Sequence, residues 1–172
     1  MKKKIFALSL ALILALSLAA CGGKKSTTLK VAASPTPHAE ILNQCVDLLK
    51  EQGIELVVTE YSDYVVPNTA VEDGDEDANY FQHVPYLDNF NAERGTHLVS
   101  VAGVHIEPMG LYAGKSASLD AIPDGGKVAV PNDPTNEGRA LLLLEAQGRS
   151  QLKDSYNLSS THKDSAENPQ NL

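Results

Sequence analysis

Residues 29–61 read LKVAASPTPHAEILNQCVDLLKEQGIELVVTEY, and the fold class follows from their pattern. Leu29–Ala33 is a short, mostly apolar run typical of a strand, and the prolines that follow it end the run. The apolar spacing from His38 to Gln52 predicts a helix, which Gly53 terminates. Ile54–Tyr61 predicts a second strand. A strand, a helix and a strand in this order indicate a parallel α/β sheet.

The same alternation continues down the chain. The spacing predicts helices over residues 65–71, 85–93 and 136–146, and strands over residues 78–81, 98–104, 104–112 and 127–130. From Gly148 to Leu172 apolar residues are few and no period is visible, which predicts either a loop or part of an unfinished domain. We therefore expect an α/β fold with mainly parallel sheets.

The first residues have the pattern of an export signal. Three lysines precede an apolar run up to Ala20, and Leu18-Ala19-Ala20-Cys21 is similar to a bacterial lipobox. We expect residues 1–20 to be a lipoprotein signal peptide, Cys21 to carry the lipid, and residues 21–28 to be a flexible tether. An ordinary cleaved signal with an incidental cysteine is the alternative. The predicted location is the cell membrane, lipid-anchored and facing the extracytoplasmic side.

Composition excludes several classes of protein. The chain of 172 residues has 14 Lys and Arg against 22 Asp and Glu, a net charge of −8, which argues against a nucleic-acid partner. No Gly-x-Ser-x-Gly, His-Glu-x-x-His or phosphate-binding glycine loop is present, so we expect neither an enzyme nor a cofactor. Cys45, within the predicted helix over residues 38–52, is expected to be a small buried hydrophobe.

Two stretches resemble metal sites only superficially. The acidic run over residues 72–77 lacks the ligand spacing of a calcium loop, so it predicts a solvated turn. His105 and Glu107 would share one face of a strand, which leaves a zinc or manganese site as an alternative. Scattered histidines are usually polar surface, and we predict no metal.

A strand-to-helix loop at residues 131–139 is a candidate anion site. The start of a helix offers unpaired N–H groups, and Arg139 in the first turns could bind a carboxylate with two parallel hydrogen bonds. Asn132 and Asn136 could accept hydrogen bonds from an ammonium group. The alternative is that these Asn and Asp residues are ordinary helix caps.

Aromatic residues gather around residues 79–86 in a chain that is only 5% aromatic. If the strand persists, Phe81 and His83 lie on one face and Tyr80 on the other. Together with Tyr64 they could form a flat-walled slot for an apolar or thioether side chain. A core aromatic with a capping histidine explains the pattern equally well.

Taken together, several long stretches resemble one family, the methionine-binding lipoproteins of the NlpA/MetQ type that serve ABC importers. The matching stretches occur in the family's order, and the lipobox fits as well. They are residues 29–42, 63–68, 77–87, 105–112 and 130–141.

The resemblance implies a two-lobed, periplasmic-binding-protein-like (Venus flytrap) fold that binds L-methionine, or a close analogue, in an interlobe cleft. Lobe one would be residues 29–108 and lobe two residues 109–172. Because members of the family are longer, the resemblance also implies that lobe two is incomplete here, in a truncated or partial protein. Its partners would be a membrane permease and the ATPase that drives it.

The resemblance also assigns ligand-binding residues. Arg139 would hold the ligand's carboxylate, with Asn136 nearby as a polar anchor. The ligand's side chain would rest among Tyr64, Phe81, His83 and Tyr86. Two alternatives stay open: a binding protein for another amino acid or a short peptide, and a truncated surface lipoprotein that binds no ligand and acts as an adhesin or antigen.

Overall fold

The computed structural model describes residues 27–155 and 157–172, so the predicted signal peptide, Cys21 and most of the tether lie outside the described residues. The chain divides into two compact units, one ending at Phe81 and the other running from Gln82 to Leu172. The units are defined by packing alone, and the lobe boundary after residue 108 stays a prediction. Within the described ranges, no helix combines the length and apolar character needed to cross a membrane.

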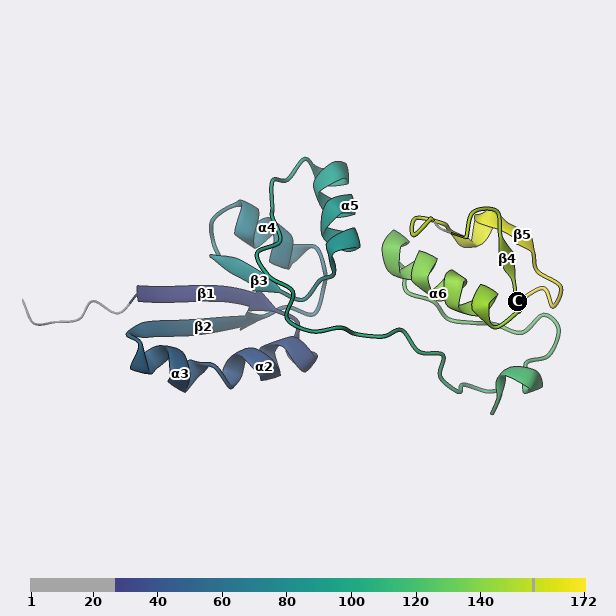
Figure 1. Cartoon of the computed structure of the whole chain (residues 1–172), viewed down its shortest axis with the longest axis horizontal. Coiled ribbons are helices and arrows are strands. Elements are labelled where there is room, and N and C mark those ends of the chain that lie inside the picture. The colour runs from purple at the N-terminus through teal and green to yellow at the C-terminus, as the bar shows by residue number, and fades with distance from the viewer. Residues whose placement is uncertain (1–26, 156) are drawn as a thin grey trace, which may run out of the picture. The chain divides into compact units, whose positions relative to one another are not determined.

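The first unit is built on a parallel sheet of three strands, β1 (Thr27–Ala33), β2 (Ile54–Glu60) and β3 (Ala78–Tyr80), in the order β2-β1-β3. Helices cover both faces of this sheet (Figure 1). The central strand β1 is therefore buried towards its carboxyl end, where Ala32 and Ala33 have no exposed surface. β1 begins two residues before the predicted strand, because Thr27 and Thr28 already pair with β2.

The predicted helix over residues 38–52 forms as three short elements. A kinked turn at Pro35–Ala39, in which Thr36 has extended backbone (φ −128°, ψ 131°), leads into α2 (Glu40–Asn43), and α3 (Val46–Glu51) follows after a tightened turn. In that turn the N–H of Cys45 donates to the Leu42 carbonyl at 2.8 Å, which is the spacing of a 3₁₀ helix. The expectation that Cys45 is buried is wrong: its side chain is half-buried.

α4 (Val66–Glu72) covers the face of the sheet opposite α2 and α3 (Figure 1). It begins one residue later than predicted. The carboxylate of Asp63 accepts hydrogen bonds from the N–H groups of Val65 and Val66, each at 2.8 Å, and so starts the helix. The acidic run forms a turn after α4, as expected. Within it Glu76 is buried and only 7% exposed, so this part of the run is not solvated.

The second unit contains the two longest described helices, α5 (Val84–Arg94) and α6 (Pro134–Ala146), both at their predicted places. α5 ends at Gly95, whose φ of 69° is the left-handed conformation that glycine adopts freely. Short 3₁₀ turns occur at Leu119–Ala121 and His162–Asp164.

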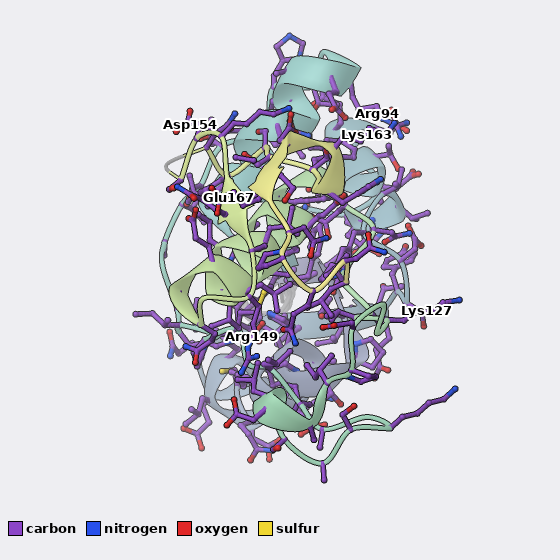
Figure 2. The ribbon with its side chains drawn as sticks, turned by 90° about the vertical axis from the view of Figure 1, so that its right-hand side faces the viewer. Arg94, Lys127, Arg149, Asp154, Lys163 and Glu167 are labelled. Carbon is purple, nitrogen blue, oxygen red and sulfur yellow. The ribbon has the colours of Figure 1, made fainter. Side chains whose placement is uncertain are left out.

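The tail after Gly148 is mostly irregular in backbone, and it packs against the rest of the second unit. It forms the short antiparallel pair β4 (Gln151–Leu152) and β5 (Ser165–Glu167). Leu152 packs into a small core with Leu141 and Leu144 of α6. Arg149, labelled in Figure 2, donates to the Asp120 carboxylate at 2.5 Å and to Gln170 at 3.2 Å. These contacts fasten the tail to the rest of the second unit.

Three predicted strands are wrong. Residues 98–104, 104–112 and 127–130 are not in any ladder of the described structure and run as irregular backbone. Alternating apolar residues create only a tendency to extend, and a strand also needs a neighbour that accepts its hydrogen bonds. Without that neighbour Val101 and Ile106 remain 89% and 90% exposed.

Candidate functional site

The aromatic pair Tyr64 and Phe81 lies in the first unit, where α4 begins and β3 ends. The two ring centroids are 5.6 Å apart and the ring planes are tilted by 38°. Phe81 is buried at 8% exposure, whereas Tyr64 is 48% exposed. Open α/β sheets place ligands at the carboxyl ends of their strands, which is where this pair lies.

β3 ends at Tyr80, so strand alternation does not extend to His83 as the sequence had suggested. Tyr80 contacts His38 edge-on instead, with ring centroids 4.7 Å apart. His83 is the N-cap of α5, and its Nδ1 accepts a hydrogen bond from the N–H of Tyr86 at 3.2 Å. The capping role that the sequence left open is therefore real.

The other ring nitrogen of His83, Nε2, is buried and has no hydrogen-bond partner among residues 27–155 and 157–172. Burial lowers the pKa of His83 and is the largest effect, a hydrogen bond with the backbone raises it in part, and the charge of Arg139 lowers it further against a smaller opposing effect of Asp133. The ring is therefore neutral at pH 7. Because Nδ1 is an acceptor, the proton is assigned to Nε2. A buried N–H without an acceptor is a natural place for a ligand to accept a hydrogen bond.

Tyr86 is buried at 8% exposure and packs on its own helix. Its ring centroid lies 6.1 Å from that of Phe90, one helical turn later. The backbone N–H of Tyr86 donates to the His83 ring, and the Tyr86 ring lies on the buried face of α5.

The start of α6 carries a chain of polar contacts. Asp133 is the N-cap, and its carboxylate accepts from the backbone N–H of Asn136 at 3.0 Å and from the side-chain amide of the same residue at 3.0 and 3.1 Å. The Asn136 carbonyl oxygen in turn accepts from Nη1 of Arg139 at 2.9 Å. Asn136 thus uses both ends of its amide to connect the cap to the guanidinium.

Arg139 is held from a second direction as well. Its Nη2 donates to the backbone carbonyl of Glu107 at 2.9 Å, from a residue 32 positions earlier. A guanidinium held at two nitrogens keeps one orientation, which favours two-point recognition of a carboxylate. Asn132, the other predicted asparagine, is exposed in the loop and forms no part of this chain of contacts.

The structure brings together some of the predicted residues within each unit. Tyr64 meets Phe81 in the first unit, and Asn136 meets Arg139 in the second. Arg139 is also close enough to His83 to affect its pKa. Asp133 takes the capping role that the sequence left open for the Asn and Asp residues of this loop, and its contact with the Asn136 side chain is the part that the sequence did not reveal.

His105 and Glu107 do not share a strand face, because the strand expected there does not form. They contact each other directly, with Nε2 of His105 at 2.8 Å from a Glu107 carboxylate oxygen. Within the second unit this contact is an ion pair or hydrogen bond between partly exposed side chains.

Comparison with known proteins gives a consistent result. A model of the NlpA lipoprotein family matches residues 29–172. The D-methionine-binding lipoprotein MetQ of Salmonella typhi is 44% identical over 174 residues, which cover 99% of this chain and 64% of the relative. The methionine-binding lipoprotein MetQ of Bacillus subtilis is 42% identical and covers 99% and 65%. The chain therefore spans slightly under two thirds of the length of these relatives.

Solved structures agree with these relatives. A putative lipoprotein from Ruminococcus gnavus superimposes with a TM-score of 0.82 and 58% identity, covering 84% of this chain and 60% of that protein. A nutrient-binding protein from Burkholderia cenocepacia bound to methionine superimposes with a TM-score of 0.80 and 44% identity, covering 84% and 61%. The predicted α/β class and periplasmic-binding-protein-like fold are confirmed.

Proposed function

The chain belongs to the NlpA lipoprotein family, and from this premise we propose that it is the substrate-binding lipoprotein of an ABC importer, with L-methionine or a close analogue as its ligand. The observation that supports this most is the arrangement around Arg139. A guanidinium oriented by Asn136 and by the Glu107 carbonyl suits the carboxylate of an amino acid. The protein is a receptor in this proposal, with no chemical step.

The ligand's side chain has two sources of contacts in this proposal. His83 offers the Nε2–H that lacks an acceptor, a donor that a thioether sulfur or a carboxylate oxygen can satisfy. Tyr64 and Phe81 offer flat rings, on which sulfur packs favourably. The proposed ligand-binding residues are Tyr64, Phe81, His83, Tyr86, Asn136 and Arg139.

The proposed partners follow from the family. We place the protein at the cell membrane through a lipid on Cys21, on the extracytoplasmic side, since the names of its relatives describe lipoproteins. A permease and its ATPase would receive the ligand. The names of relatives also favour a second ligand, D-methionine, because several carry that word.

Calorimetric titration of the full chain with L-methionine, D-methionine and L-alanine tests the proposal. We expect binding of at least one methionine isomer and much weaker binding of alanine.

Arg139→Ala should weaken methionine binding by about 2–5 kcal/mol, the usual result of removing one partner of a charge-assisted pair. Arg94→Ala, an exposed arginine at the end of α5 (Figure 2), is the matched control and should bind like the parent. Equal affinity of parent and Arg139→Ala would refute the carboxylate assignment. Absence of binding by the parent would favour a surface lipoprotein without a small-molecule ligand.

A further inference from the structure

Two asparagine side chains form a hydrogen-bonded pair inside the first unit. Asn68 has no exposed surface and is, with Pro67, one of the two largest fully buried side chains of the described residues. The side-chain amide of Asn79 donates to the Asn68 carbonyl oxygen at 2.8 Å and to the Pro67 backbone carbonyl at 3.1 Å. Burying an amide costs free energy that only such hydrogen bonds offset, so the pair stabilises one arrangement of the chain over others.

The pair joins one helix to one strand. Asn68 lies in α4, and Asn79 is the middle residue of β3, opposite Ala32 of the central strand. Successive strand residues point to opposite faces. Tyr80 contacts His38, which lies in the turn that leads into α2, and α2 and α4 lie on opposite sides of the sheet (Figure 1). Asn79 therefore points to the face covered by α4, where the pair fixes the start of that helix against the end of β3.

Each of the joined elements is next in the chain to one ring of the aromatic pair. Tyr64 lies in the turn before α4, between the Asp63 cap and the clamped residues Pro67 and Asn68. Phe81 follows Asn79 by two residues. The contact between Asn68 and Asn79 thus joins the two segments on which the rings lie, and the ring centroids are 5.6 Å apart.

We propose that Asn68 and Asn79 are positioning residues, whose hydrogen-bonded pair sets the spacing of the Tyr64 and Phe81 rings and thereby the preference for a long, unbranched apolar ligand side chain over a short one. This rests on the proposed function and adds to it a determinant of selectivity that touches no ligand atom. A purely structural pair would affect all ligands equally, through the folded fraction alone.

The main variant replaces both partners, Asn68→Leu with Asn79→Leu, because two apolar groups of similar shape avoid leaving a side-chain oxygen unpaired. Two readouts on the full chain are needed. The first is the nuclear Overhauser effect between the ring protons of Tyr64 and Phe81, which requires no ligand. The second is the ratio of the affinities for L-methionine and L-alanine by calorimetry.

We expect the double variant to lose the contact between the rings and to lower the methionine-to-alanine ratio by about tenfold. Asn68→Asp keeps an oxygen acceptor for Asn79 but places a carboxyl group where no surface is exposed, so it should retain both readouts at a pH low enough to keep that group protonated. Asn91→Leu is the matched control, since Asn91 is a part-buried amide that donates to the Leu98 carbonyl at 2.8 Å in the second unit. It should reduce stability and leave both readouts unchanged.

Should the double variant not fold, Asn79→Ser takes its place, because its single hydroxyl donor can satisfy only one of the two oxygens. An unchanged ring contact and an unchanged ratio in a folded variant would overturn the proposal, as would a parent without the ring contact. If the parent shows the ring contact but binds no methionine, the proposed function fails. The ring contact of the variants then still decides whether the pair positions the rings.

Discussion

Nη1 of Arg139 donates to the side-chain carbonyl of Asn136 at 2.9 Å, three residues earlier on the same helix. The Asn136 amide is in turn bound by the carboxylate of Asp133, a further three residues earlier. One helical stripe therefore connects a negative cap, an amide and a guanidinium. The guanidinium is preorganised, so a ligand would not have to order it.

The first prediction concerns Asn136→Ala. Arg139 then loses one of its two positions of support and keeps only the Glu107 carbonyl, so ligand binding should weaken by about tenfold, close to 1.4 kcal/mol. Calorimetry measures the change, and Asn132→Ala in the exposed loop is the control. Equal losses in the two variants would mean that Asn136 does not orient Arg139.

The second prediction concerns the cap itself. Asp133→Ala removes the acceptor of the Asn136 N–H and should lower the free energy of unfolding by about 1 kcal/mol, as the loss of an N-cap usually does. Asp133→Ser retains a capping oxygen and should recover most of the lost free energy of unfolding. Urea denaturation followed by circular dichroism provides both values. A Ser variant as unstable as the Ala variant would contradict the assignment of Asp133 as the cap.

Local patterns were enough to predict this helix and its neighbours. The apolar residues that predicted α5 and those that predicted α6 each lie within one short stretch of the chain, and both helices are confirmed. The order strand, helix, strand over residues 29–61 also predicted the parallel pair of β1 and β2. In the helices the interacting groups are near in sequence. The pairing of the two strands follows from the rule that strands joined by a helix lie parallel in one sheet.

Contacts between distant residues were not predictable in the same way. The carbonyl that holds Arg139 belongs to Glu107, and no periodicity links the two positions. The strand predicted over residues 104–112 failed for a related reason, since a strand depends on a partner that its own sequence does not describe. The Asn68–Asn79 pair likewise depends on how α4 lies against β3.

The third prediction uses the pKa of His83. Burial and Arg139 lower this pKa below its ordinary value near 6.5, so in acid the unfolded chain binds a proton more readily than the folded chain. The contribution of His83 to the free energy of unfolding is complete above the pKa that this residue has in the unfolded chain. It is lost as the pH falls through the lower pKa that His83 has in the folded chain. His83→Asn keeps a capping side chain and removes the titration, so its free energy of unfolding should fall less between pH 7.5 and 5.

Parallel urea titrations at the two pH values measure this difference. His97→Asn, at an exposed position, is the control and should follow the parent. A His83→Asn variant that loses as much stability in acid as the parent would show that His83 carries no such linkage.

The fourth prediction concerns the contact between α6 and the tail. Gly138 is buried in α6, and a Cβ placed on it would lie far inside the contact distance of the Leu158 carbonyl oxygen. Gly138→Ala must therefore push the backbone near Leu158 away from the helix, and backbone yields less easily than a flexible side chain. We expect a loss of about 1–3 kcal/mol in the free energy of unfolding, the usual cost of overpacking, although alanine is the better helix former. Gly103→Ala is the control, since no atom lies within 4 Å of its added Cβ, and it should change stability little. Because Gly138 directly precedes Arg139, the Gly138→Ala variant should also weaken methionine binding. A Gly138→Ala protein with a higher free energy of unfolding than the parent would mean that the tail does not lie against α6.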